Sequence, residues 1–395
     1  MTAPSRLPAP SSTPTFAILD LAALEREGAA WDDLVSRAMD PHPHYSRHVL
    51  ATHRAAGLAP DDLRIVVVRS GVRLDAVLPF RSTYDLCGLG RPVAQPFLSP
   101  FVTATHPLVG DGPDWPATLA ALVAGLRAAS GGRPWRWPLL ATGTRLGQAL
   151  CAAMKADGWA LGEVEAFARP MLDRRPSHDA FVTDHPHRAR LKDLRRRQRR
   201  LSEGGHLTLE TATVGDALAA AVETFLALEK ISWKGAAGSA MACRAPHAAF
   251  ARALFSGGGG PVSARADTLA RDGRPLAVSL ALLAGGTACL LKTTYDEAER
   301  AGAPGLVLEA EIVRVLHETA FAERLDSATL AGSALESLYP DRETIAEIVG
   351  VPDGGRGLVS LERRVRLARF EHAAKAGAKR RLAESAMAQR LMGRR

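Results

Sequence analysis

Residues 290–311 read LLKTTYDEAERAGAPGLVLEAE, and this stretch decides the fold. Its first part is rich in β-forming residues and predicts a strand that carries Lys292, Tyr295 and Asp296 to its end. Pro304-Gly305 then opens a run whose apolar residues recur at helical spacing, which predicts an amphipathic helix. A strand that passes through a polar loop into a helix is a building unit of a mixed α/β fold.

The predicted junction between this strand and this helix carries groups that suit chemistry. A helix N-terminus presents free N–H groups and a positive dipole, which bind a phosphate or a carboxylate. Tyr295 can protonate a leaving thiolate, and Asp296 can accept a proton or orient an acceptor. The alternative is a junction whose polar residues only cap and hydrogen-bond locally. We favour the functional interpretation because two further segments support it.

The strongest charge feature lies upstream, in residues 185–205, which read HPHRARLKDLRRRQRRLSEGG. Lys and Arg side chains crowd one predicted helix over residues 188–200, with only Asp193 and Glu203 opposing them. This helix is either a solvated face that leads into a second domain or a binding surface for CoA phosphates, lipid headgroups or RNA. Charge runs alone do not decide between these interpretations.

Residues 225–241, FLALEKISWKGAAGSAM, end a predicted helix in a loop rich in Gly and Ala. Gly235 and Gly238 permit a close approach of the backbone to a ligand. Trp233 can form one wall of an acceptor pocket. The alternative is a plain helix stop with a tryptophan in the core.

The same order of elements recurs in both halves of the chain: helices, a central antiparallel hairpin, a helix and a final strand. In the first half, the β-rich runs on either side of Ser70-Gly71 predict the hairpin. We therefore predict two related α/β units joined near residues 173–185, each a twisted, mostly antiparallel sheet flanked by helices. The expected limits are a disordered leader at 1–14, an N-terminal domain at 15–175, a catalytic domain at 176–375 and a basic tail at 376–395.

The composition is that of an ordinary globular protein with an excess of positive charge. The 395 residues carry a formal net charge of +8, which permits a polyanionic partner but selects none. The cysteines form no CxxC pair, and neither a Gly-x-Ser-x-Gly elbow nor a P-loop motif occurs, which disfavours a zinc site, a hydrolase and an NTPase. Because neither a signal peptide nor a membrane-spanning run is expected, the predicted location is the cytoplasm.

Taken together, the segments at 188–205, 225–241 and 290–311, followed by RLDSATL at 324–330, resemble the CelD-type acetyltransferases associated with cellulose and exopolysaccharide synthesis. That family belongs to the GNAT superfamily and is similar to the FemAB peptidyltransferases. The resemblance covers most of residues 15–370. It implies two tandem GNAT-like domains, with donor and acceptor meeting in a cleft of the second. Its recurring positions fall on Trp233, Lys234, Lys292, Tyr295, Asp296 and Gly305.

The resemblance also implies a pyrophosphate-binding loop of the pattern R/Q-x-x-G-x-G/A. Here the corresponding stretch is Arg300-Ala-Gly-Ala-Pro-Gly305, with Gly302 one position early. The expected donor contacts are Arg300, Gly302, Pro304 and Gly305, and the expected acceptor contacts are Trp233 and Lys234. The altered loop leaves the donor open among acyl-CoA, an acyl-carrier protein and an aminoacyl-tRNA.

We predict an N- or O-acyltransferase that takes an acetyl or acyl group from a thioester, with acetyl-CoA or another acyl-CoA as co-substrate and with no permanently bound cofactor or metal. Lys292, Tyr295 and Asp296 are the expected catalytic residues. The acceptor is a small amine or hydroxyl, including a sugar in polysaccharide biosynthesis. Two alternatives stay open: a FemAB-like aminoacyltransferase that uses aminoacyl-tRNA, and a non-catalytic adaptor of a polysaccharide synthase. The 188–200 helix is the candidate contact with tRNA or with an inner-membrane surface, and no DNA partner is expected.

Overall fold

The computed structural model describes residues 13–256, 259–353 and 360–392. The strands of the first half are β1 (Thr15–Asp20), β2 (Arg64–Ser70), β3 (Arg73–Thr83), β4 (Val93–Pro96), β5 (Leu108–Val109), β6 (Trp135–Ala141) and β7 (Ala160–Asp173). Those of the second half are β8 (Leu207–Ala212), β9 (Ser263–Arg271), β10 (Arg274–Ala284), β11 (Thr287–Tyr295), β12 (Arg324–Asp326) and β13 (Asp341–Val351). They form one 13-stranded sheet in the order β1-β2-β3-β4-β6-β13-β7-β12-β11-β10-β9-β8, with β5 beside β3. Only the pairs β4–β6 and β11–β12 are parallel among these strands.

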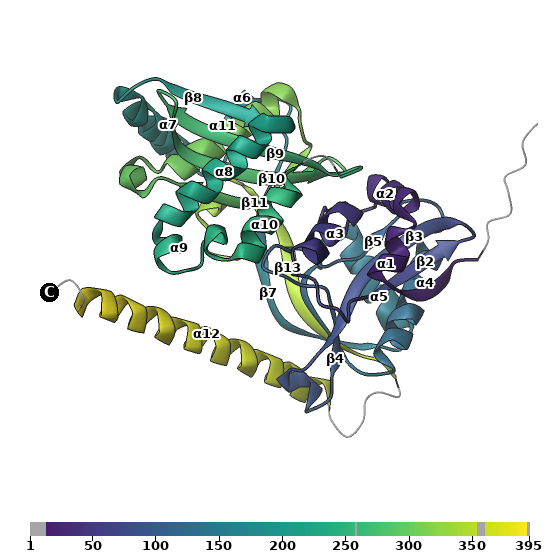
Figure 1. Cartoon of the computed structure of the whole chain (residues 1–395). Coiled ribbons are helices and arrows are strands. Elements are labelled where there is room, and N and C mark those ends of the chain that lie inside the picture. Colours follow the sequence, from purple (N-terminus) through teal and green to yellow (C-terminus); the bar gives the residue numbers. More distant parts are fainter. Residues whose placement is uncertain (1–12, 257–258, 354–359, 393–395) are drawn as a thin grey trace, which may run out of the picture.

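Helices flank this sheet in both halves (Figure 1). The first half contains α1 (Leu21–Glu25), α2 (Gly28–Ser36), α3 (Arg47–Ala55), the 3-10 turn η1 (Leu86–Gly88), α4 (Trp115–Ser130) and α5 (Arg145–Ala156). The second contains α6 (His178–Asp184), α7 (Arg188–Glu203), α8 (Gly215–Ile231), α9 (Trp233–Ala236), η2 (Met241–Cys243), α10 (Ala245–Leu254), η3 (Glu297–Gly302), α11 (Pro304–Thr319), η4 (Ala334–Ser337) and α12 (Leu361–Met392). Apart from the two-residue strand β5, the order β2-β3-β4-α4-β6 recurs as β9-β10-β11-α11-β12, which confirms the predicted mixed α/β class with two related units.

The two faces of the second sheet half are covered by different helices. Leu280 of β10 packs in the same apolar cluster as Phe225 of α8. Ala277, on the opposite face of β10, shares a second cluster with Val313 of α11. The sheet therefore separates an α8 side from an α11 side, and each side chain of β11 can be assigned to one of them.

Each half contributes its last strand to the sheet of the other. β13 lies between β6 and β7, where Ile345 pairs with Ala141 on one side and with Phe167 on the other. β7 lies in turn between β13 and β12, where Asp173 pairs with Arg324. The expected domain limit at 175/176 thus falls directly after a strand that both halves share.

The last helix is anchored to the first half through a buried guanidinium. Arg136 of β6 donates to Glu347 of β13 and to Glu371 of α12, both at 2.6 Å. From there α12 runs away from the body as one long helix (Figure 1). The segment expected as a basic tail continues this helix to Met392, while residues 1–12 of the expected leader lie outside the described residues. Within the described ranges, none of the helices has the length and hydropathy needed to cross a membrane.

Candidate functional site

The parallel strands β11 and β12 separate after a short common run. They pair only where Thr287–Cys289 meets Arg324–Asp326. β11 then continues to Tyr295, whereas the chain after Asp326 turns away through Ala328, whose φ is +53°. The edge of β11 from Leu290 onward therefore faces an opening, which we call the β11–β12 wedge. It contains a cavity of about 290 Å³ lined by β11, the first turns of α11 and residues of the 327–335 segment.

A β-bulge in β11 interrupts the regular alternation of its side chains between the two faces of the sheet. Leu290 pairs with Ala281 and Lys292 with Leu280, which leaves Leu291 as the extra residue. A bulge of this kind re-aims the side chains that follow it. As a result Leu290 packs on the α11 side, whereas Lys292, two residues later, points to the α8 side. Thr293, next in the chain, points again to the α11 side.

The N-terminus of α11 forms one wall of the wedge, close to Tyr295. A Cβ atom added to Gly305 would lie 3.2 Å from Cδ1 of Tyr295, so the ring and the helix backbone are in close contact. The helix begins at Ala303 (φ +48°) and Pro304 without a side-chain cap. Among the described residues the amide of Gly305 has no hydrogen-bond partner, whereas the next two amides, of Leu306 and Val307, both donate to the carbonyl of Ala303. A free amide at a helix start favours an anionic ligand.

A buried carboxyl group lies under the wedge on the α11 side. Oε1 of Glu309 accepts hydrogen bonds from Ser279 (2.9 Å) and Thr293 (2.7 Å). Its Oε2 accepts one from the Tyr339 hydroxyl at 3.1 Å. Burial raises the pKa of Glu309, and the three hydroxyl donors partly oppose that shift. Sequence patterns did not single out this residue, although a carboxylate on the apolar stripe of an amphipathic helix was the signal available.

A second buried carboxyl group lies on the α8 side. Glu229 of α8 faces Lys292 at 3.3 Å and Lys234 at 3.4 Å, and it accepts the amide of Met241 at 2.7 Å. Burial lowers the pKa of Lys234 below that of a free lysine. Trp233, next to Lys234 in the chain, is 57% exposed. The structure thus brings the expected residues Lys234 and Lys292 together through a carboxylate that sequence reasoning missed.

The remaining expected residues lie along the loop between β11 and α11. Asp296 accepts the amide of Ala298 at 3.0 Å, as the N-cap of η3, and pairs with Arg274. Arg300 is exposed and is not among the residues that line the wedge cavity. Gly302 packs on Leu201 of α7, where a Cβ would come within 2.4 Å of the leucine side chain. Of the expected residues, Lys292, Tyr295 and Gly305 line the wedge, whereas Asp296, Arg300 and Gly302 do not.

The basic helix α7 is held in place by buried leucines and by some of its arginines, while its other cations have no ion pair among the described residues. Its leucines at 191, 194 and 201 are buried in the apolar cluster that α7 shares with α11. Asp193 pairs with the guanidinium groups of Arg190, Arg196 and Arg197, and Arg197 also donates to the carbonyl of Ala301 at 2.8 Å. The other cations of the helix, with no ion pair among the described residues, are Arg188, Lys192, Arg195, Arg199 and Arg200.

The corresponding opening in the first half is filled by the chain itself. β4 and β6 pair in parallel at a single position, Ala94 with Trp135. The chain then returns beside β6, where the amide of Thr105 donates to Leu139 at 3.2 Å and Trp137 donates its indole N–H to Thr105 at 3.1 Å. Thr105 is fully buried. The described residues therefore contain one open wedge, in the second half.

A small polar cavity of about 70 Å³ lies where the two halves meet, on the α8 side of the strand junction. We call it the junction cavity, and its lining includes Glu343, Asp326, Cys289 and His42. Burial raises the pKa of the Glu343 carboxyl to about 7, and the charge of Asp326 adds to this shift. Burial also raises the pKa of the Cys289 thiol, which opposes a role as a thiolate nucleophile.

Comparison with known proteins identifies the second half. Residues 188–329 match the family model of the acetyltransferase (GNAT) domain. Among solved structures, FemX aligns over 82% of this chain and 95% of its own, at 11% identity and a TM-score of 0.54. The C-terminal domain of a putative lysylphosphatidylglycerol synthetase from Agrobacterium fabrum covers 84% of this chain and 92% of its own, at 15% identity and a TM-score of 0.51. No curated protein sequence shows significant similarity to the chain. At these identities the structural likeness establishes a shared fold.

Proposed function

With a GNAT acetyltransferase domain over residues 188–329, the protein is an acyltransferase, and we propose that its donor is a thioester bound in the β11–β12 wedge. The acyl group passes directly to an amine or hydroxyl of a small acceptor. The observation that carries this proposal is the open edge of β11 beside the uncapped start of α11, because both border the same cavity. The free amide of Gly305 supports binding of an anionic group of the donor.

The proposed reaction needs little from the side chains. The acceptor nitrogen or oxygen forms a bond to the thioester carbonyl carbon, and the carbon–sulfur bond breaks. Backbone N–H groups on the open edge of β11 stabilise the developing oxyanion, and alignment of the two substrates supplies proximity. The sulfur leaves as a thiolate and takes a proton from the hydroxyl of Tyr295, which lines the wedge. The proton that the acceptor nitrogen or oxygen loses passes through solvent and restores the Tyr295 hydroxyl.

We propose that the acceptor approaches from the α8 side of β11. There Lys234 and Lys292 pair with Glu229, and Trp233, next to Lys234 in the chain, is exposed; this group of residues supports binding of a polar acceptor. Asp296 supports the loop rather than the reaction in this scheme, since its carboxylate already caps η3 and pairs with Arg274. A sugar acceptor in cellulose or exopolysaccharide synthesis rests on the sequence resemblance alone.

Acyl-CoA is the donor that we favour, with acetyl-CoA as its simplest form. The free cations of α7, next to the loop before α11, support a donor with several phosphates. The same cations equally support binding of the tRNA of an aminoacyl-tRNA donor. Because the fold is shared with FemX, aminoacyl-tRNA is the second candidate donor. We do not favour a non-catalytic adaptor, because the open wedge would then have no role.

Equilibrium binding to the full chain tests the donor. We expect acetyl-CoA or a longer acyl-CoA to bind, and Ala334→Trp, which places an indole in the wedge from η4, to abolish binding. Leu330→Trp is the matched control, because Leu330 is 64% exposed and does not line the cavity. Binding of an acylated carrier protein or charged tRNA, with no binding of any acyl-CoA, would replace the CoA assignment. Acyl-CoA binding that survives Ala334→Trp would refute the wedge as its site.

A further inference from the structure

A second cavity lies on the face of α11 that points away from the sheet. It has a volume of about 540 Å³ and is enclosed by α6, α7, α11 and Leu338. We call it the outer pocket. Gly305, Leu306 and Glu309 of α11 line the wedge, whereas Val307, Ala310 and Arg314 line the outer pocket, so the two cavities use different faces of one helix. Its size falls within the range of about 300–1,000 Å³ that small-molecule sites occupy.

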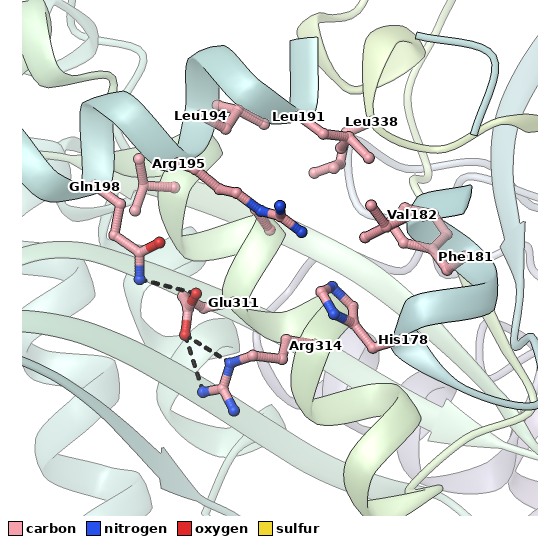
Figure 2. Close-up of a pocket in the computed structure, with 12 residues that line it drawn as sticks. His178, Phe181, Val182, Leu191, Leu194, Arg195, Gln198, Glu311, Arg314 and Leu338 are labelled. Atoms are coloured by element: carbon pink, nitrogen blue, oxygen red, sulfur yellow. Dashed lines mark hydrogen bonds and ion pairs between the residues drawn. The ribbon is translucent and has the colours of Figure 1, made fainter. Parts of the chain in front are cut away.

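Most of the walls of the outer pocket are apolar. Figure 2 shows Phe181 and Val182 of α6, Leu191 and Leu194 of α7 and Leu338 around its rim. Phe181 and both leucines are buried, which fixes them in the apolar cluster between α7 and α11. A lining of this composition favours a ligand with a hydrocarbon portion.

Most polar groups of the pocket already have partners. Glu311 accepts Gln198 at 2.9 Å and both Nε and an Nη of Arg314 at 3.1 and 2.9 Å. Arg314 also donates to Glu318 at 2.5 Å. This chain of contacts lies at one side of the pocket in Figure 2. Arg314 is thus already paired with two carboxylates, Glu311 and Glu318, so it does not offer a free cation to a ligand.

Arg195 differs from these polar groups because its guanidinium has no partner among the described residues. Its side chain leaves α7 and extends over the pocket toward His178 (Figure 2). Among the described residues it has no ion pair and no hydrogen-bond partner, unlike Arg196 and Arg197 on the same helix, which pair with Asp193. Burial lowers the pKa of His178, so that ring is neutral near pH 7. The outer pocket therefore presents one unpaired positive charge above apolar walls.

We propose that the outer pocket binds an amphipathic monoanion: a hydrocarbon tail against the apolar walls, and one anionic headgroup on the guanidinium of Arg195. A planar guanidinium binds a carboxylate through two parallel hydrogen bonds, which makes a medium-chain carboxylate the simplest ligand of this class. The outer pocket shares no lining residue with the wedge proposed for the donor, and this proposal stands without the donor assignment.

Three probes with equal tails and different headgroups test the proposal: decanoate, decanol and decyltrimethylammonium, each used below its aggregation concentration with the full chain. We expect saturable 1:1 binding of decanoate, weaker binding of decanol and the weakest of the cation. Arg195→Gln should weaken decanoate binding by about tenfold or more, because a charge-assisted hydrogen bond is lost. Arg199→Gln, on the same helix but outside the pocket, should leave the affinity unchanged.

A second variant tests the pocket rather than the charge. Ala310→Trp fills the space from α11, and it should abolish decanoate binding while acetyl-CoA binding persists. Any one of three outcomes would overturn the proposal. Wild type and Arg195→Gln could bind decanoate with equal affinity, or the wild type could bind decanoate and decanol equally well. The third is decanoate binding that survives Ala310→Trp in a variant with a normal thermal melt. Because Ala334→Trp blocks only the wedge, it should not affect decanoate, so failure of the donor assignment can be recognised separately.

The same chemistry is found in a free carboxylate and in the acyl chain and headgroup of an anionic phospholipid. Flotation with phosphatidylglycerol vesicles, and with phosphatidylcholine vesicles as the neutral reference, distinguishes these sources. Vesicle binding that requires phosphatidylglycerol and is lost in both Arg195→Gln and Ala310→Trp identifies a membrane lipid as the ligand. If these variants leave vesicle binding unchanged but weaken decanoate binding, the ligand is a free amphiphile.

Discussion

The hydroxyl of Thr293 on β11 donates to the buried carboxyl group of Glu309 on α11 across the floor of the wedge, with 2.7 Å between the oxygens. Thr293→Val removes this donor and keeps the shape of the side chain. We expect a loss of about 1–3 kcal/mol in the free energy of unfolding, because the buried carboxyl group loses one of the two donors to its Oε1. Thr293→Ser should retain most of the stability. Urea denaturation checks both, and Thr294→Val, on the α8 side, is the control; similar losses at both threonines would contradict the assigned bond.

Tyr295 and Asp296 are neighbours with different expected roles. Tyr295→Phe should lower acyl transfer on the order of 10²-fold with little change in melting temperature, because a positioned proton donor is removed. Asp296→Asn should instead affect stability, since Asp296 caps η3 and pairs with Arg274. Steady-state thiol release from acyl-CoA with an amine panel, together with thermal melts, separates the two effects. Wild-type turnover in Tyr295→Phe would remove this residue from the mechanism.

One donor should bind per chain. The wedge of the second half is open, whereas Thr105 and its neighbours fill that of the first half. Calorimetry with an acyl-CoA should therefore give a stoichiometry near one, and Ala334→Trp should remove all of the binding heat. A stoichiometry of two, or a variant that keeps half of the heat, would mean that the first half also accepts a donor.

The arginines of α7 should divide into two functional groups. Replacing Arg199 and Arg200 by Gln removes charges without ion pairs among the described residues, and it should weaken binding of an anionic partner and reduce the salt dependence of that binding. Replacing Arg196 and Arg197 by Gln removes the same charge but breaks contacts to Asp193 and Ala301, so it should lower stability more. Binding of acyl-CoA, anionic vesicles and tRNA over a salt series provides the measurement. If the two double variants have the same stability and the same affinity for anionic partners, α7 is a uniformly solvated helix without a binding role.

Glu343 should make stability depend on pH. Burial raises the pKa of this carboxyl from 4.5 to about 7, with Asp326 adding to the shift and Arg324 and Arg169 opposing it. A raised carboxyl pKa in the folded state gives stability that is present below pH 4.5 and lost as pH rises through 7. Glu343→Gln cannot ionise, so its stability relative to wild type should increase across this window, by up to about 3 kcal/mol at pH 8. Urea denaturation at pH 4.5, 6 and 8 checks the trend; a constant difference would show that Glu343 titrates normally.

Local patterns were sufficient for elements whose partners lie nearby in the sequence. Ile65–Val68 are all buried, so their unbroken apolar run predicted β2, and Gly71 with φ +62° supplies the turn into β3. The strand, loop and helix over residues 290–311 were predicted for the same reason and are confirmed as β11, η3 and α11. In each case the pattern and its contacts belong to one stretch of chain.

Elements defined by distant partners were missed. β13 reads DRETIAEIVGV, and its acidic residues obscured a strand whose Glu347 is paired with Arg136, far away in the sequence. Only the first three residues of RLDSATL form a strand, β12, because the chain leaves β11 after Asp326 and so opens the wedge. The bulge at Leu291 and the donors to Glu309 likewise arise only when separate elements meet. Residue types alone could not supply these relationships.

The exchanged strands determine the order in which the sheet can be completed during synthesis on the ribosome. β6 and β7 emerge early, but their shared neighbour β13 begins only at Asp341. At about 5–20 residues per second, translation leaves the two strands without that neighbour for roughly 10 to 30 s. During this interval the nascent chain carries open strand edges that can aggregate, and a chaperone that covers them would favour the native product. For the same reason, a gene split after codon 175 yields two halves that each lack a strand, and each must obtain it from the other half.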